Sequence, residues 1–446
     1  MERRVEPRLP RGMRDILPAQ MILRQYVIGT IQEVFERFGF EPLQTPAIEL
    51  SEIFTGKYGE DAEHLIYRLA RQADKGPELV LRYDLTVPLC RVIAQYPELV
   101  KPFKRYQIAP VWRGERPQKG RYREFYQCDA DTIGTSSVMA DAEMLNIIYE
   151  VLTRLGFKSF VININNRKVL GGIGRLSGVP EEVLPVLYRS IDKLDKIGEE
   201  GVRHELGALD AARMPDETVD RLLGLLNIRC GTEEMVARLG KDLEAYPEAA
   251  EGVAELREIV GCLRGLGIPE DCYRIVPSMV RGLGYYTGPI FETVVKEPKI
   301  GSITGGGRYD RLVGMFTQRS YPATGTTIGI ERIIDVMEEM KMFPPEVGPT
   351  VTKVLVTRFS PDMVEASLKC ATSLRRAGIN TEAYFESDPL GDQIRYALKK
   401  GIRFVAVVGP DEAAAGKVTI KNLAAGKQET LALDDAVARL CRWDMP

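Results

Sequence analysis

The sequence contains very little histidine. Its 446 residues include two, His64 and His204, and neither has a histidine neighbour. An HExxH motif and a His-rich zinc site are therefore absent, and a Ser-His-Asp triad would have to use one of two isolated residues. We expect His204, in a charged stretch, at the surface, and we interpret His64 as structural. The chemistry is expected to rely on positioning and fixed charge instead of imidazole proton transfer.

Paired cysteines and long apolar runs are also missing. The seven cysteines include no CxxC pair, so zinc knuckles and thioredoxin-type motifs are excluded, and we expect free thiols in a reducing cytoplasm. No run approaches 18 apolar residues and the N-terminus does not resemble a signal peptide, so we predict a cytoplasmic protein without a membrane partner. With 60 Lys and Arg against 63 Asp and Glu, the net charge of −3 excludes a polycation but allows a local basic surface.

Hydrophobic periodicity divides the chain into regions. Residues 20–38 have helical spacing, and 79–165 alternate short apolar runs with turns around one helical stretch at 138–155. This pattern predicts an α+β domain in which helices cover an antiparallel sheet. Residues 167–270 read as a helical insertion. A Pro-rich linker at 341–350 precedes a β-α-β-α-β pattern in 351–446, which predicts a small α/β domain.

One segment, 104–123, is strongly basic in a net-acidic protein. It carries seven cations and one acid, Glu115; the cations are Lys104, Arg105, Arg113, Arg116, Lys119, Arg121 and Arg123. A basic hairpin of this kind suits phosphate or a nucleic acid backbone. A solvated hairpin tip is the alternative.

Three glycine-rich segments follow, at 281–288, 305–310 and 325–332, and each contains an arginine. None matches a P-loop or a dinucleotide-binding fingerprint. Arginines beside glycine turns favour stabilisation of a phosphoryl transition state by cations. Tight hairpins with surface arginines would give the same pattern.

Together these segments resemble the histidyl-tRNA synthetases. Residues 113–131 resemble motif 2 of class II aminoacyl-tRNA synthetases, 325–332 resemble motif 3, and 20–50 resemble motif 1. The segments 281–288 and 306–310 look like the two histidine-binding motifs of that family, and Pro10-Arg-Gly-Met-Arg-Asp15 also fits. The resemblance implies a class II catalytic core over 1–340, with motif 1 at about 20–50, motif 2 at 104–134 and motif 3 at 323–334. It also implies an anticodon-binding domain over 351–446.

The resemblance also implies roles for individual residues. Arg113 and Arg281 would be catalytic. The ATP-binding residues would be Arg113, Glu115, Arg121 and Arg332. The histidine-binding residues would be Asp84, Thr86, Arg113, Gln127, Asp131, Arg281, Tyr285, Tyr286 and Tyr309. Contacts to the tRNA acceptor end would come from Arg116, Gln118, Lys119 and Arg123. A carboxylate and a phenol can pair with both imidazole nitrogens, which is consistent with Asp131 and Tyr286 selecting histidine.

The implied reaction is the ATP-dependent ligation of L-histidine to tRNA(His) through a histidyl-adenylate. Magnesium would bind mainly through ATP and not to protein ligands. A homodimer is expected, and no DNA partner. A catalytically silent paralogue, such as the regulatory subunit of ATP phosphoribosyltransferase, is the main alternative, and a class II enzyme for another amino acid is a third. One departure from the family is Gly284, where Asp is usual; it removes a carboxylate beside Tyr285.

Overall fold

The computed structural model describes residues 5–57, 63–70, 76–118, 120–180, 184–191, 194–207, 215–280 and 284–443. These residues form two compact units. One comprises the chain up to residue 14 together with 27–342, and the other comprises 15–26 together with the chain from 343 onward. The boundary therefore passes through the first helix, α1 (Pro18–Arg37), and each unit is described by itself.

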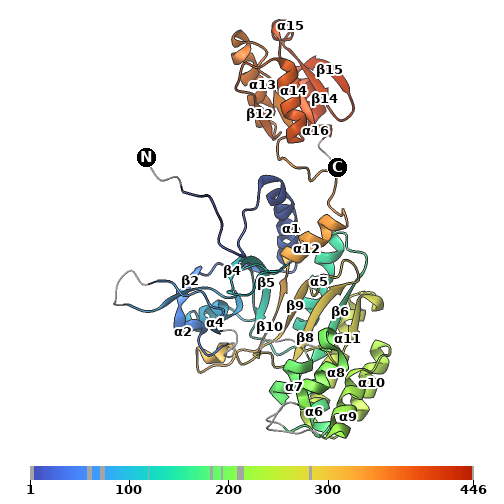
Figure 1. The fold of residues 1–446 in the computed structure, drawn as a ribbon. Helices are drawn as coiled ribbons and strands as arrows, with labels where there is room; N and C mark the ends of the chain where they lie inside the picture. Colours follow the sequence, from blue (N-terminus) through green and yellow to red (C-terminus); the bar gives the residue numbers. More distant parts are fainter. Residues whose placement is uncertain are drawn as a thin grey trace. The chain divides into compact units, whose positions relative to one another are not determined.

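The first unit is built on an eight-stranded sheet (Figure 1). In spatial order the strands are β1 (Glu41–Pro42), β4 (Phe103–Trp112), β5 (Glu124–Ile133), β10 (Ala323–Ile328), β9 (Thr304–Arg308), β8 (Pro289–Val295), β6 (Phe160–Asn166) and β7 (Tyr273–Ile275). The pairs β1–β4 and β6–β7 are parallel and every other pair in this sheet is antiparallel. The prediction of an antiparallel sheet with helices on it is confirmed.

Alternation along the central strands separates the two faces of this sheet. In β5, Gln127, Asp129 and Asp131 share one face, and the intervening Cys128 and Ala130 point to the other. Helix α5 (Met139–Arg154) packs on β10 and β9, and α11 (Pro247–Gly265) packs on α5, while α12 (Ile330–Glu339) packs on β5. The polar face of β5 is therefore left for a cavity.

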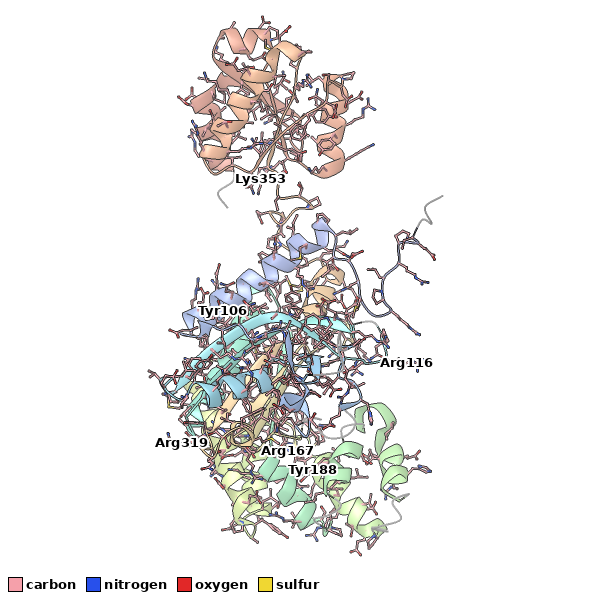
Figure 2. The ribbon with its side chains drawn as sticks, turned by 90° about the vertical axis from the view of Figure 1, so that its left-hand side faces the viewer. Tyr106, Arg116, Arg167, Tyr188, Arg319 and Lys353 are labelled. Atoms are coloured by element: carbon pink, nitrogen blue, oxygen red, sulfur yellow. The ribbon has the colours of Figure 1, made fainter. Side chains whose placement is uncertain are left out.

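The remaining N-terminal elements support the β1–β4 edge. Tyr106 lies in β4 (Figure 2). Phe35 of α1 packs against its ring, with centroids 5.7 Å apart and the ring planes tilted by 44°, and the Tyr106 hydroxyl donates to Glu36 over 2.8 Å. Strand β3 (Leu79–Leu81) does not join the main sheet as its apolar run suggested. It pairs with β2 (Ile48–Leu50) in a separate two-stranded sheet beside α2 (Ser51–Phe54) and α4 (Thr86–Gln95).

The segment interpreted as an insertion is helical where it is described. Its helices before α11 are α6 (Arg167–Leu176), α7 (Leu184–Ile191), α8 (Leu194–Gly207), α9 (Asp216–Leu226) and α10 (Thr232–Asp242). Arg167 stacks on Tyr188, 4.6 Å from the ring centroid, which joins α6 to α7 (Figure 2). The short helices η2 (Glu270–Cys272) and η3 (Val313–Met315) complete this unit.

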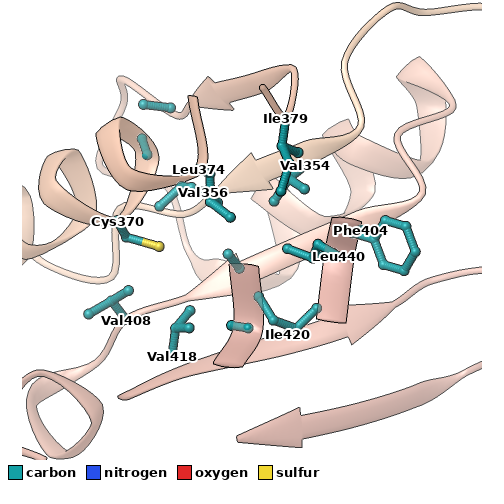
Figure 3. Close-up of a cluster of buried hydrophobic side chains, with 14 residues drawn as sticks. Val354, Val356, Cys370, Leu374, Ile379, Phe404, Val408, Val418, Ile420 and Leu440 are labelled. Atoms are coloured by element: carbon teal, nitrogen blue, oxygen red, sulfur yellow. The ribbon is translucent and has the colours of Figure 1, made fainter. Parts of the chain in front are cut away.

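The C-terminal part of the second unit is an α/β domain with a five-stranded mixed sheet. Its strand order is β12 (Thr381–Ala383), β11 (Val354–Val356), β13 (Phe404–Val407), β14 (Lys417–Asn422) and β15 (Lys427–Ala432). Its helices are η4 (Pro361–Met363), α13 (Val364–Arg376), α14 (Leu390–Lys400), α15 (Pro410–Ala414) and α16 (Leu433–Trp443). The predicted β-α-β-α-β pattern is present, and the hairpin β14–β15 extends it. Val356, Leu374 and Ile420 meet in one apolar core (Figure 3).

Two sequence expectations about single residue types can be checked directly. All seven cysteines are free thiols, and the two histidines are exposed. Within the described ranges, no helix combines the length and the apolar character needed to cross a bilayer.

Candidate active site

A cavity of about 240 Å³ opens on the polar face of β5, β9 and β10. Eleven of the predicted site residues line it: Asp84, Thr86, Arg113, Glu115, Arg121, Gln127, Asp131, Tyr285, Tyr286, Tyr309 and Arg332. They come from segments up to about 250 positions apart in the chain, roughly from 84 to 332. One end of the cavity is acidic and aromatic, and the other end carries the arginines.

The acidic end is built around Asp131, which is almost fully buried. Its Oδ2 pairs with Arg105 Nη2 over 2.8 Å, and its Oδ1 accepts a hydrogen bond from the Tyr309 hydroxyl. Burial raises the pKa of Asp131, and both Arg105 and Tyr309 oppose that rise by stabilising the carboxylate. Tyr309, predicted to bind histidine, orients Asp131 through this hydrogen bond.

Two glycines allow the backbone of β9 and β10 to approach this carboxylate. A Cβ added to Gly325 would lie 2.0 Å from Asp131 Oδ1, and one added to Gly306 would lie 2.1 Å from the Gly325 carbonyl oxygen. Any side chain at either position would therefore displace the floor of the cavity. This explains the glycine-rich composition of both segments.

A second buried acid, Asp129, lies one strand pleat from Asp131 on the same face. Its Oδ2 lies 3.5 Å from Gln127 Nε2, and it pairs in register with Thr327 of β10. Burial, followed by repulsion from Asp131, raises the pKa of Asp129 to about 7. Sequence reasoning missed Asp129, although its i+2 spacing from both Gln127 and Asp131 was a usable signal.

The remaining groups at the acidic end come from loops. Asp84 Oδ1 accepts a hydrogen bond from the Val87 backbone N–H over 3.0 Å, which fixes this carboxylate at the start of α4 beside Thr86. Tyr285 packs against Tyr286 and Tyr309 with ring centroids 4.8 and 5.9 Å away. These three rings form an aromatic wall beside the carboxylates.

Arg113 stands at the start of the basic end. Its guanidinium lies over the rings of Tyr83 and Phe125, 4.4 and 5.1 Å from the centroids, and its Nε donates to the Tyr83 carbonyl over 3.1 Å. Its two Nη nitrogens have no hydrogen-bond partner among the described residues. The stacking fixes the guanidinium while its fork stays available for an oxyanion.

Arg121, in the motif 2-like turn, and Arg332 both line the cavity. Arg121 Nε pairs with Glu115 Oε2 over 3.0 Å, and Arg332 Nη1 donates to the Ser302 carbonyl over 2.5 Å. A Cβ at Gly120 would be 3.5 Å from the Arg332 side chain, so the turn packs directly on this arginine. Two predicted ATP-binding arginines thus share one wall.

A small cluster links the N-terminal segment to this wall. Arg14 pairs with the buried Glu331 and lies over the Tyr122 ring, 3.8 Å from its centroid, while Glu331 Oε1 accepts the Tyr126 backbone N–H over 3.3 Å. Arg14 therefore fixes both β5 and the start of α12. Glu331 and Tyr122 line the cavity and were not predicted.

Some predicted residues lie elsewhere. Arg116, near the surface in Figure 2, and Gln118 are exposed on the turn. Arg123 donates to the carbonyls of Glu115 and Arg11, over 3.0 and 3.3 Å, so its guanidinium has protein partners. Lys119 and Arg281 lie outside the described residues.

The interpretation of 104–123 as one basic hairpin surface is wrong at its start. Arg105 is fully buried against Asp131, and Lys104 pairs with Glu143 over 2.9 Å and donates to the Phe38 carbonyl over 2.6 Å. Both residues belong to the strand β4, where alternate side chains point inward, and not to the turn.

Comparison with known proteins places the chain in a family. The family model for histidyl-tRNA synthetase matches residues 12–333 and the model for an anticodon-binding domain matches 353–443. A histidine–tRNA ligase of Aeropyrum pernix is 43% identical over 97% of both chains. The crystal structure of histidyl-tRNA synthetase from Nostoc sp. PCC 7120 has a TM-score of 0.87 at 34% identity, covering 98% of this chain and all of that one.

A structure from Bacillus halodurans described as an ATP phosphoribosyltransferase regulatory subunit/histidyl-tRNA synthetase has a TM-score of 0.75. At 21% identity, with 91% of this chain and 99% of that one covered, it shows a shared fold alone. The architecture is that of a class II synthetase catalytic domain followed by an anticodon-binding domain. The extent and identity of the matches, over the same segments that build the cavity, show that this chain belongs to the histidyl-tRNA synthetase family.

Proposed function

We propose that this cavity is where the chain activates L-histidine with ATP and transfers it to tRNA(His). The observation that carries the proposal is that one cavity has a buried carboxylate at one end and three arginines at the other. The substrate must present an imidazole to the first end and the phosphates of ATP to the second. The family is ATP-dependent, which agrees with this polarity.

At the acidic end, Asp131 accepts one imidazole N–H and Tyr286 pairs with the other ring nitrogen. Arg105 and Tyr309 keep Asp131 ionised and oriented for this purpose. Asp84, Thr86 and Gln127 bind the α-ammonium group. Another amino acid would leave these buried polar groups unpaired, which is the basis of selection.

At the basic end, Arg113 binds the substrate carboxylate and the α-phosphate together. The carboxylate oxygen attacks the α-phosphorus in line, a new C–O–P linkage forms, and pyrophosphate leaves. Arg281 acts on the charge that develops at the α-phosphate, and Arg332, Arg121 and Glu115 hold the remainder of ATP. The terminal ribose hydroxyl of tRNA then attacks the carbonyl carbon and expels AMP.

The described residues do not form a protein cage for magnesium. No group of three or more His, Cys, Asp or Glu among them could hold an ion, and the carboxylates nearest the arginines, Glu115 and Glu331, are paired with Arg121 and Arg14. Magnesium would be held mainly by the phosphates of ATP and would neutralise charge on pyrophosphate.

The other proposals concern partners and location. Arg116, Gln118, Lys119 and Arg123 contact the acceptor end of the tRNA. Residues 351–446, after the linker 341–350, bind the anticodon. The protein acts as a homodimer in the cytoplasm.

ATP–pyrophosphate exchange with each of the twenty amino acids tests this function. Exchange with histidine alone supports it, and charging of tRNA(His) completes the test. Exchange with a different amino acid indicates another class II specificity. No exchange with any amino acid favours the regulatory paralogue and contradicts the enzyme assignment.

A further inference from the structure

Asp129 is a buried acid in the cavity that the reaction described above does not use. It lies in β5 between Gln127 and Asp131, lines the cavity, and is 3% exposed. Its opposite neighbour in β10 is Thr327. Asp129 therefore belongs to the wall that faces the substrate, at a defined step along the strand.

The hydrogen bonding of Asp129 is incomplete. Its Oδ1 accepts no hydrogen bond from the described residues, and its other contacts are the long 3.5 Å one from Gln127 Nε2 to Oδ2 and a hydrogen bond with the Thr327 side chain. The Gln127 Oε1 is also buried without a donor. A buried carboxylate in this condition is costly unless a ligand supplies a cation or N–H donors.

The surrounding charge favours a cation. Asp84, Asp129 and Asp131 act on one another at this end, and Arg105, the guanidinium that faces them, is paired with Asp131. An ATP phosphate would be repelled here. An ammonium group would both pair with Asp129 and reduce the repulsion between neighbouring carboxylates.

The distance between Asp131 and Asp129 along β5 indicates which group of the substrate would lie beside Asp129. Residues two apart on one face of a strand are separated by about 6.6 Å. If Asp131 binds the imidazole, the next pleat toward Gln127 and Arg113 lies where the α-carbon end of the amino acid must be. Asp129 occupies that pleat.

We propose that Asp129 is a further substrate-binding residue, whose carboxylate pairs with the α-ammonium group of the substrate amino acid. This role rests on the proposed function, because it assumes that histidine occupies the cavity with its ring at Asp131. Gln127 then joins the two groups, because its Nε2 faces Asp129 and its Oε1, which has no donor among the described residues, accepts from the ammonium group.

The test uses ligands that separate the groups of histidine. Histidinol keeps the ammonium group and lacks the carboxylate, whereas imidazolepropionate keeps the ring and the carboxylate and lacks the ammonium group. Calorimetric titration of the full-length protein measures each Kd. Asp129→Asn is expected to raise the Kd of histidine and of histidinol by about 10–100-fold, and the Kd of imidazolepropionate by less than about threefold.

The pH profile provides a second readout. Because the carboxyl of Asp129 has a raised pKa of about 7, it is ionised above that pH and protonated below it. The groups that face it are Asp131, Arg105, Thr327 and Asp84. The ratio of the wild-type affinity for histidinol to that of Asp129→Asn should therefore fall toward one as the pH decreases from 8 to 6. Protonation of the ligand's own imidazole affects both proteins equally, so it cancels in this ratio.

Several outcomes would overturn the role. Equal weakening of all three ligands would place Asp129 at the ring, and unchanged affinity for histidinol would remove it from recognition. If Asp129→Asn does not fold, Asp129→Ser and Asp129→Glu are titrated in its place. A wild-type protein that binds none of the ligands would contradict the proposed function itself, whereas normal wild-type binding with an unaffected variant would contradict Asp129 alone.

Discussion

The first unit contains two buried Arg–Asp pairs whose surroundings differ. Arg308 pairs with Asp141 of α5, and its other donors reach the carbonyls of Thr135 and Ser137, each over 3.0 Å. Arg105 pairs with Asp131, yet its Nε and Nη1 have no hydrogen-bond partner among the described residues. Every nitrogen of the Arg308 guanidinium therefore has an acceptor, whereas only one of the three Arg105 nitrogens, Nη2, has one.

The difference separates a structural pair from a functional one. The free energy lost when a charged pair is removed from water is compensated only if the remaining N–H donors also find acceptors. Arg308 meets that condition and Arg105 does not. Arg105 holds Asp131 at the cavity wall although two of its own nitrogens lack hydrogen bonds. Incomplete local satisfaction is expected where a site is organised for a ligand.

The largest expected effect is on the functional pair. Asp131→Asn keeps the shape of the side chain and removes its charge, so the charge-assisted contact to the imidazole is lost. We expect kcat/KM for histidine in pyrophosphate exchange to fall about 100-fold, since such a bond is worth roughly 1.5–3 kcal/mol, while KM for ATP changes little. A change in KM for ATP as large as that for histidine would contradict this separation.

Loss of either acid leaves a buried guanidinium and lowers stability, but at the structural pair we expect no accompanying loss of activity. Asp141→Asn removes the buried counter-charge of the Arg308 guanidinium and leaves it only the partly exposed Asp310, 3.4 Å from Nη1, so we expect a loss of about 3 kcal/mol in the free energy of unfolding. Chemical denaturation measures the loss, and histidine KM should stay within about threefold.

A double variant sharpens this result. Removing both buried charges, with Asp141→Leu and Arg308→Met, should cost less than the sum of the single changes because no buried charge is left unpaired, and the remaining Asp310 is partly exposed. Additive losses would show that the two side chains do not act as a pair.

The sequence predicted much of the fold because its periodicities are local. Helix α1, helix α5 and strands β4 and β5 follow from apolar spacing within each segment. The pairing of β3 with β2 did not follow, since an apolar run does not specify its partner. The burial of Arg105 was missed for a similar reason: only the β4–β5 register brings it opposite Asp131.

The candidate site was predicted where family motifs mark it. Eleven of the site residues that these motifs predicted line one cavity, although composition alone could not have joined residue 84 to residue 332. The prediction missed three lining residues. Asp129 contributes through the face of β5, whereas Glu331 and Tyr122 contribute through contacts with the distant Arg14.

A smaller effect is expected from the glycine beneath Asp131. In Gly325→Ala the new Cβ would lie 2.0 Å from Asp131 Oδ1, so the carboxylate must move while Arg105 and Asp131 remain present. We expect histidine KM to rise about tenfold, because one charge-assisted hydrogen bond is distorted but not removed. Initial rates of pyrophosphate exchange over a range of histidine concentrations measure it. An unchanged KM would mean that the floor of the cavity relaxes without displacing Asp131.

The smallest effect is expected at Gly284, where the family usually has Asp. A Cβ added there meets no atom within 4 Å, so Gly284→Asp introduces no clash, in contrast to Gly325→Ala. The added carboxylate would lie beside Tyr285 on the aromatic wall and not between Arg105 and Asp131. We therefore expect histidine KM and kcat to change by less than about threefold, a difference of roughly 0.7 kcal/mol. A gain or loss greater than tenfold in the same exchange assay would show that a charge at this position, and not only the Arg105–Asp131 pair, controls how the acidic end binds its ligand.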